Sequence, residues 1–303
     1  MKEFFGLLVA AFKEWGADQA SRLSAALAYY AVFSLAPLLV LAVSIAGLVF
    51  GEEAANGEVA NQLSGLMGDQ AAVTVQSALA ATGDRRSDGI WGMIVGTGVL
   101  LFGASTVFGE LKNALNTIWG VAPRPGRAVA TLVRDRLLSF SLVFGIGFVL
   151  LVSLVISSLI AGLGSMIASR FAMAPWVWGA VDFALSVGLT GVLFAAVFRI
   201  LPDVRLHWSD VWSGAFFTGV LFTIGKSGIA WYLGRNSVAS SFGAAGALVV
   251  ILLWVYYASC ILFLGAEFTK VRHLRKRGPI KPEPHAVRIA SAQSAFEKTN
   301  AET

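Results

Sequence analysis

The feature that most restricts the fold of this chain is a run of thirty residues without a charge, from Ser237 to Ala266. A helix rises about 1.5 Å per residue, so a helix of this length exceeds the roughly 30 Å hydrocarbon core of a bilayer. Glu267 follows at once, and a basic cluster comes directly after it, made of Lys270, Arg272, Arg275, Lys276 and Arg277. A water-soluble domain has no use for so long an uncharged helix with so abrupt a basic end. The chain is therefore predicted to be an integral membrane protein.

The composition supports a membrane protein and restricts its chemistry. Hydrophobic residues make up 56% of the 303 residues and charged residues only 14%, well below the usual share in soluble domains. The formal net charge of +5 favours cytoplasmic loops and anionic headgroups over nucleic acid, because Lys and Arg collect in the inner loops of membrane proteins. Cys260 is the only cysteine, which excludes an intramolecular disulfide and a multi-cysteine metal site.

Apolar segments along the chain predict an all-α integral membrane bundle over residues 23–269. Six transmembrane helices are expected, at about residues 28–50, 90–109, 138–162, 179–199, 211–233 and 243–266. Within the first of these, Pro37 removes a backbone donor and is a hinge candidate, with a tolerated proline as an equal alternative.

The segments outside these spans are predicted to be amphipathic or polar. Residues 1–22 should form an amphipathic helix in the headgroup plane, anchored by Trp15. The first external loop should contain short amphipathic helices. Residues 270–303 form a basic, then polar, tail that we expect to be disordered beyond Gly278.

The distribution of positive charge predicts the orientation of the chain. Four of the 23 Lys and Arg residues lie in connections on one side, namely Arg85, Arg86, Arg170 and Arg235. Lys226 lies within a span, and the other Lys and Arg residues lie in the termini and the remaining connections. By the positive-inside rule, both termini should face the cytoplasm.

One charged pair is predicted inside the membrane. Counted along their helices, Lys226 lies roughly 22 Å and Asp182 roughly 25 Å from the cytoplasmic ends, so the two could meet in the outer half of the bilayer. A charge at that depth costs about 2.5–3.5 kcal/mol and needs a partner, water or a function. The pair could fix helix register, Lys226 could snorkel, or it could bind an anionic headgroup or another acidic substrate.

A second polar cluster is predicted at the cytoplasmic ends of the helices, here called the cytoplasmic rim. Its candidate members are Glu110, Arg199, Asp203 and Glu267. The alternative is that these charges are simply solvated among the hydrated lipid headgroups. The three histidines lie in cytoplasmic connections without carboxylates or cysteines at metal-ligand spacing, and no phosphate-binding loop is present. We therefore expect no catalytic residues, no metal, no cofactor and no enzymatic activity.

Several segments together resemble the YihY/BrkB family of bacterial inner-membrane proteins. They are residues 22–39 (RLSAALAYYAVFSLAPLL), 110–120 (ELKNALNTIWG), 201–203 (LPD), 212–215 (WSGA), the Gly225-Lys226 pair, 242–257 (FGAAGALVVILLWVYY) and 265–269 (GAEFT). The resemblance covers about residues 10–270 and implies six membrane helices and a location in the inner membrane. It adds further polar candidates to those named above: Arg22, Tyr29, Tyr30, Asn116 and Tyr256.

Three functions are compatible with this sequence. The first is a transporter or lipid-handling protein for an amphipathic, anionic envelope molecule, and the second is an envelope scaffold or assembly factor that transports nothing. The third is a membrane-bound hydrolase or nuclease, a function suggested by the name ribonuclease BN that many family members carry. It is the least favoured, because the sequence groups no acidic or histidine metal ligands. The expected partners are the bilayer, anionic headgroups at its cytoplasmic face and a lipid-like or anionic substrate, with no nucleic acid and with homo-oligomerisation left open.

Overall fold

The computed structural model describes residues 2–34, 106–124, 175–235 and 246–289. These residues form mainly helices: α1 (Lys2–Ala17), α7 (Pro175–Ile200), α8 (Trp208–Arg235) and α10 (Gly246–Arg277). Two further helical segments cover residues 20–34 and 106–118. The short strands β1 (Val121–Pro123) and β2 (Ala286–Arg288) complete the described part.

Small residues let the three long helices cross closely. On α8, Gly214 and Thr218 face Gly265 and Thr269 of α10, so that each threonine lies over the glycine of the other helix. Each hydroxyl also donates to the carbonyl four residues earlier on its own helix, at 2.6 Å for Thr218 and 2.7 Å for Thr269. This reciprocal Gly–Thr crossing leaves no room for a larger side chain at either glycine. A similar contact joins α8 to α7, where Gly219 lies against the backbone of Gly191.

The main core lies where the helix of residues 106–118 packs on α7 and α10. Leu115 and Ile118 are fully buried there against Phe198 and Phe263. The helix ends before Gly120, whose φ of 64° suits glycine at a helix C-terminus.

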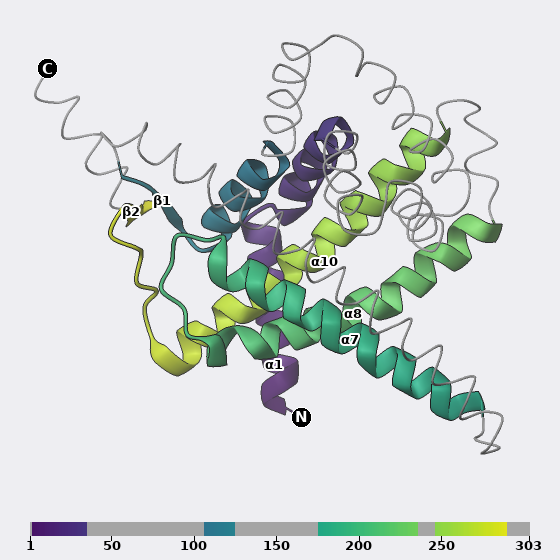
Figure 1. The fold of residues 1–303 in the computed structure, drawn as a ribbon. Coiled ribbons are helices and arrows are strands. Elements are labelled where there is room, and N and C mark those ends of the chain that lie inside the picture. Colours follow the sequence, from purple (N-terminus) through teal and green to yellow (C-terminus); the bar gives the residue numbers. More distant parts are fainter. Residues whose placement is uncertain (1, 35–105, 125–174, 236–245, 290–303) are drawn as a thin grey trace, which may run out of the picture.

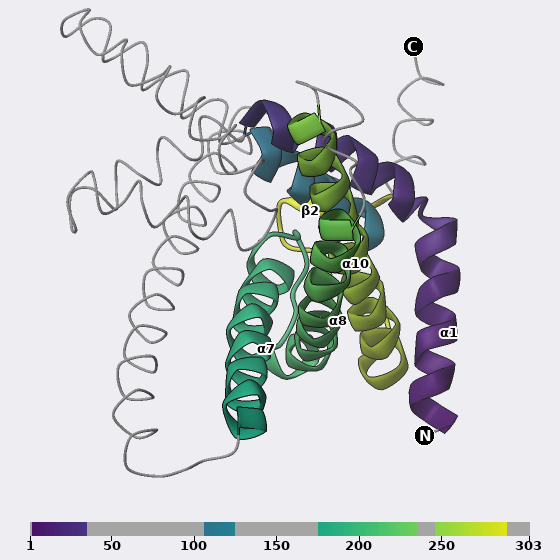
Figure 2. The same ribbon diagram turned by 90° about the vertical axis from the view of Figure 1, so that its right-hand side faces the viewer.

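Helix α1 packs against the outside of the bundle with one of its faces. Ala11 is buried with Leu264 and Phe268 of α10, and the ring of Phe4 contacts those of Phe217 and Phe268. Figure 1 shows α1 running across α8 and α10, and Figure 2 shows it at the edge of the molecule. A turn at residues 18–19, where Gln19 has a φ of 52°, separates α1 from the helix of residues 20–34. The amphipathic helix expected at the N-terminus is thus present, whereas its place in the headgroup plane stays a prediction.

The end of the chain departs from the prediction. Strand β2 pairs antiparallel with β1, with Ala122 opposite Val287, so the described part is not purely helical. The expectation of disorder beyond Gly278 is wrong for residues 279–289. Main-chain hydrogen bonds at 2.9 Å hold this segment, from Arg205 N to Lys281 O and from Glu283 N to Asp203 O. Polar composition signals disorder only where no partner backbone is available, and here the α7–α8 loop and β1 supply one.

The six-helix bundle is confirmed only as a mainly helical fold. The spans predicted at 179–199, 211–233 and 243–266 coincide with α7, α8 and α10. Among the described residues, one helix is long and apolar enough to cross a bilayer, over Leu248–Arg277. The span predicted at 138–162, most of the spans predicted at 28–50 and 90–109, Pro37 and the first external loop lie outside the described residues.

Candidate functional site

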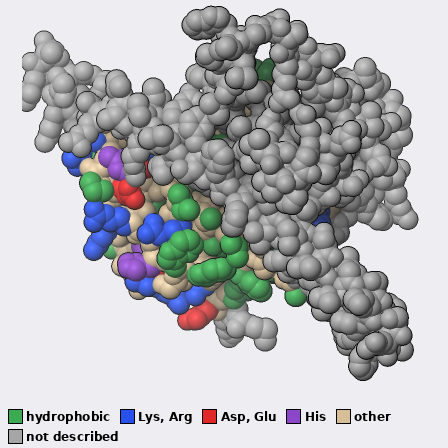
Figure 3. Space-filling view, in the orientation of Figure 1, with side chains coloured by type: hydrophobic (Ala, Val, Ile, Leu, Met, Phe, Trp, Pro, Cys, Tyr) green, Lys and Arg blue, Asp and Glu red, His purple; other side chains and the backbone are tan. Residues whose placement is uncertain are grey.

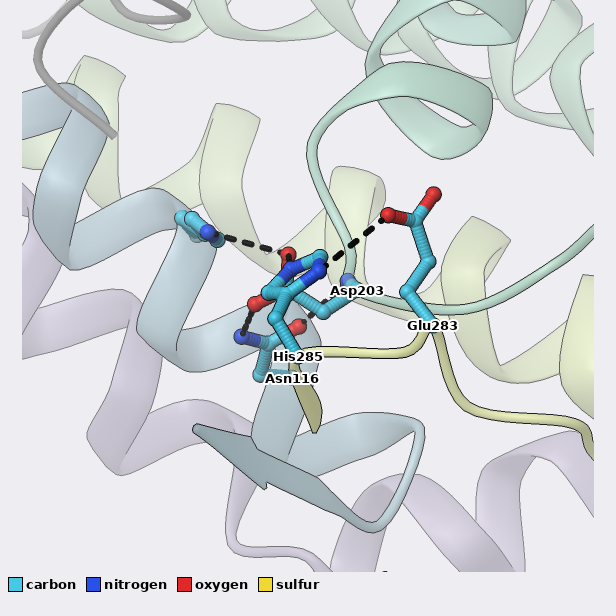
Figure 4. Close-up of polar contacts among 5 residues, drawn as sticks. Asn116, Asp203, Glu283 and His285 are labelled. Atoms are coloured by element: carbon cyan, nitrogen blue, oxygen red, sulfur yellow. Dashed lines mark hydrogen bonds and ion pairs between the residues drawn. The ribbon is translucent and has the colours of Figure 1, made fainter. Parts of the chain in front are cut away.

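Asp203, in the loop between α7 and α8, is the centre of a buried polar cluster (Figure 4). Its carboxylate oxygens lie 3.0 Å from Lys112 Nζ, 2.8 Å from His285 Nε2 and 3.0 Å from Asn116 Nδ2. Its backbone N–H donates to Asn116 Oδ1 at 2.8 Å. We call these four residues, with Glu283, the Asp203 cluster.

Three separate chain segments bring these residues together. Lys112 and Asn116 stand one turn apart on the helix of residues 106–118, facing the loop. The C-terminal segment contributes His285. The backbone carbonyl of His285 accepts a hydrogen bond from Arg124 N, just beyond β1, at 2.9 Å. The cluster therefore fastens the C-terminal segment to two parts of the bundle.

Both nitrogens of His285 face carboxylates. Nε2 contacts Asp203, and Nδ1 lies 3.5 Å from Glu283 Oε2. His285 thus lies between two carboxylates of the cluster, with the shorter contact to Asp203. Burial alone raises the pKa of Asp203, but the His285 hydrogen bond, the Lys112 ammonium and the Asn116 amide outweigh it and hold that pKa below its ordinary value.

A second cluster joins the first turn of α8 to the end of α10. Asp210 Oδ1 lies 2.8 Å from Arg277 Nε, and Oδ2 lies 3.2 Å from His273 Nδ1. Arg277 also donates to Ser209 Oγ at 3.0 Å. Burial tends to raise the pKa of Asp210, but the hydrogen bonds and charges of Arg277 and His273 lower it overall.

The third cluster joins α1 to α10 and includes Glu267. Lys270 Nζ lies 2.7 Å from Asp18 Oδ2, 3.0 Å from Glu14 Oε2 and 3.2 Å from Glu267 Oε2. We call these four residues the Glu267 cluster. Oxygens of the three carboxylates lie within 4.8 Å of one another, a spacing that could hold a metal ion. The ammonium of Lys270 already contacts all three, and it is the cation that this arrangement binds.

Lys226 differs from the charged residues of these three clusters, which contact groups of opposite charge. It lies far along α8, is partly exposed and makes no ion pair with a described residue. Beside it, Gly225 leaves room for the phenol of Tyr257 from α10. Asp182 belongs to α7, but its side chain lies outside the described residues, so its predicted pairing with Lys226 stays a prediction.

The structure does not bring together all the residues that were predicted to form one polar cluster at the cytoplasmic rim. Asp203 and Glu267 make the contacts described above with different residues, so the expected single cluster is wrong for this pair. Glu110 is half-buried, which raises its pKa. Arg199 is also half-buried, and its Nε has no hydrogen-bond acceptor among the described residues.

Of the candidates taken from the resemblance, only Asn116 joins a cluster described above. Arg22 is exposed and donates to Gln19 Oε1 at 3.0 Å, while Tyr256 is partly exposed on α10. Tyr29 and Tyr30 are exposed, with ring centroids 5.8 Å apart.

Most of the charged residues in these clusters were not among the candidates predicted from the sequence. They are Glu14, Asp18, Lys112, Asp210, Lys270, His273, Arg277, Glu283 and His285. Spacings of four residues within a helix, as in Lys112/Asn116 and His273/Arg277, were the available signal. Both histidines contact carboxylates that are distant in the sequence, which spacing along the chain does not reveal.

Comparison with known proteins identifies the family. A family model described as virulence factor BrkB matches residues 11–290. The chain is 23% identical to the ribonuclease-like protein YfkH of Bacillus subtilis over 88% of its own length and 95% of that protein. It is 28% identical to the membrane protein YihY of Escherichia coli over 64% of this chain and 62% of YihY.

A UPF0761 membrane protein of Ralstonia nicotianae is 30% identical over 55% of this chain. The match spans only 36% of the Ralstonia protein, so it covers about a third of that relative. No solved structure matches the chain. The chain therefore belongs to the virulence factor BrkB family of membrane proteins.

Proposed function

We propose that this protein moves or handles an amphipathic, anionic envelope molecule in the bacterial inner membrane, with both termini in the cytoplasm. The observation that carries the proposal is Lys226, a partly exposed ammonium roughly 22 Å along the span predicted for α8. A cation at such depth is costly, and contact with an anionic group offsets that cost. Lys226 is the residue that would contact the anionic part of the substrate.

The contrast with the rim supports this role for Lys226. In the Asp203 cluster, the Asp210 contacts and the Glu267 cluster, the cations already contact carboxylates of this chain. A substrate would have to break these contacts to bind there. Lys226 makes no such contact within the part of the chain that the structure describes.

The cytoplasmic end is proposed to contact anionic headgroups. Arg275 and Lys276 are exposed at the end of α10, and Lys13 is exposed on α1. In Figure 3 the blue and purple side chains gather at this end, beside a green apolar surface. Basic residues next to an apolar surface favour binding to anionic lipid. The proposal includes no nucleic acid, no cofactor and no enzymatic step, and it leaves homo-oligomerisation open.

Lys226→Ala is expected to slow lipid movement about tenfold, corresponding to about 1.4 kcal/mol. Purified full-length protein would be reconstituted into vesicles of phosphatidylcholine and phosphatidylglycerol that contain fluorescently labelled phosphatidylglycerol. Quenching of outer-leaflet label by dithionite then reports movement across the bilayer. Lys281→Ala, which removes an exposed lysine from the C-terminal segment, is the matched control and should retain the wild-type rate. Absence of movement with the wild type, or an unchanged rate with Lys226→Ala, would contradict the proposal.

The ion-paired clusters favour a second candidate function, that of a scaffold that transports nothing. They link α1, the α7–α8 loop and the C-terminal segment to α10 and the helix of residues 106–118, as a rigid assembly platform requires. For a scaffold, Lys226→Leu combined with Asp182→Leu should leave thermal stability and the envelope barrier of a complemented deletion strain unchanged. Loss of the barrier with retained stability would exclude the scaffold.

A further inference from the structure

The charges of the Glu267 cluster do not balance. Three carboxylates, those of Glu14, Asp18 and Glu267, surround the single ammonium of Lys270. If all three were ionised, the cluster would carry two uncompensated negative charges. Lys13, the neighbouring cation on α1, is exposed and is not part of these contacts.

Glu267 is the member least able to remain charged. Its side chain is fully buried, whereas 27% of the Asp18 side chain and 43% of the Glu14 side chain are exposed. Neither oxygen of Glu267 has a hydrogen-bond partner among the described residues, and only Oε2 contacts Lys270, at 3.2 Å. A buried carboxylate without sufficient counter-charge becomes neutral by taking up a proton.

A proton fits this site better than a metal ion. A metal bound to all three carboxylates would lie close to the Lys270 ammonium, which is within 3.2 Å of each of them, and the two cations would repel each other. A proton on Glu267 removes one negative charge without displacing Lys270. The charged groups that face Glu267 are Lys270, on its own helix, Asp18, in the turn after α1, and Glu14, on α1. The described parts of α7 and α8 add no charged group to these contacts.

We propose that Glu267 is a proton-binding site whose protonation holds α1 on α10. In the docked state the neutral carboxyl of Glu267 donates its proton to a hydrogen bond with the carboxylate of Asp18. Release of the proton to water, past the partly exposed Asp18 and Glu14, leaves a second uncompensated charge between the helices. Repulsion between Glu267 and the carboxylates of Glu14 and Asp18 then loosens α1. This inference is independent of any substrate at Lys226.

Infrared spectroscopy of the full chain in lipid nanodiscs tests the proton directly. The wild type should show the carbonyl band of a buried protonated carboxyl near neutral pH, and Glu267→Gln should lose it. Glu283→Gln, which changes a carboxyl of the Asp203 cluster, is the matched control and should keep the band. A band that persists in Glu267→Gln would overturn the proposal.

Hydrogen exchange tests the link to α1. The protection factors of the α1 amides should fall in the wild type as the pH rises, and in Glu267→Gln, which mimics the protonated acid, they should not change with pH. If Glu267→Gln fails to fold, Asp18→Asn serves as the test instead. Removal of this negative charge should abolish the pH dependence of the α1 protection factors. Unchanged dependence in the variant that folds would overturn the proposal. Thermal stabilisation by Mg²⁺ or Ca²⁺ that requires Glu267 would also overturn it, in favour of a metal site.

Discussion

Replacement of Asp203 by alanine is expected to lower the free energy of unfolding by about 3–5 kcal/mol. The change leaves the buried ammonium of Lys112 without its carboxylate, and it removes the shared acceptor of Asn116 and His285. Loss of one member of a buried charge pair costs far more than the pair itself contributes, because the other charge remains desolvated. Chemical unfolding of the purified protein in detergent measures the effect.

Arg205→Ala is the matched control for Asp203→Ala. Arg205 lies two residues away, its side chain is exposed, and its backbone N–H still donates to Lys281 O in the variant. We expect a change below about 0.5 kcal/mol for this surface residue. If Asp203→Ala were equally mild, the Asp203 cluster would not be stabilising the cytoplasmic end.

The same cluster predicts the response to acid. The pKa of Asp203 and that of Asp210 are lower in the folded protein than in the unfolded chain. Their contribution to stability is therefore fully present above about pH 4, and it is lost as the pH falls through the folded-state pKa. The wild type should lose stability below about pH 4, and Asp203→Ala should lose less over that range.

Replacement of Lys270 by methionine is expected to cost about 3–5 kcal/mol and to release α1 from α10. The variant keeps most of the side-chain volume but leaves Glu14, Asp18 and Glu267 together without a cation. Chemical unfolding measures the stability, and limited proteolysis after residue 17 reports the release of α1. Lower pH should restore part of the loss, because protonation removes the repulsion among the carboxylates.

Lys276→Met is the matched control, since Lys276 is exposed six residues further along α10. It should resist proteolysis as the wild type does. Equal behaviour of the two variants would mean that apolar contacts such as Ala11 against Leu264 hold α1 without the ion pairs.

The long helices could be predicted because a long run of apolar residues can be recognised within a single segment of the sequence. The segments that form α7, α8 and α10 contain enough consecutive apolar residues to be recognised without knowledge of their neighbours. The end of the helix over residues 106–118 also has a local signal, because Gly120 and Pro123 follow it in the sequence.

The partners at the cytoplasmic end could not be predicted, because they are remote in sequence. Asp203 is 87 residues from Asn116 and 82 from His285, and Lys270 is 252 residues from Asp18. The charges at helix ends suggested Asp203 and Glu267 as members of one cluster, and the resemblance to the family added Asn116. Only the fold places Asn116 with Asp203 and puts Glu267 beneath α1.

The reciprocal Gly–Thr crossing limits how α8 and α10 can move. Each threonine occupies a notch in the opposite backbone, Thr218 at Gly265 and Thr269 at Gly214. If either helix shifts along its axis, in either direction, a threonine side chain collides with the main chain of the other helix. A change in the crossing angle of the helices causes no such collision. The crossing therefore fixes the register of α8 against α10, and the close packing of Tyr257 over Gly225, next to Lys226, adds a second contact between the same two helices.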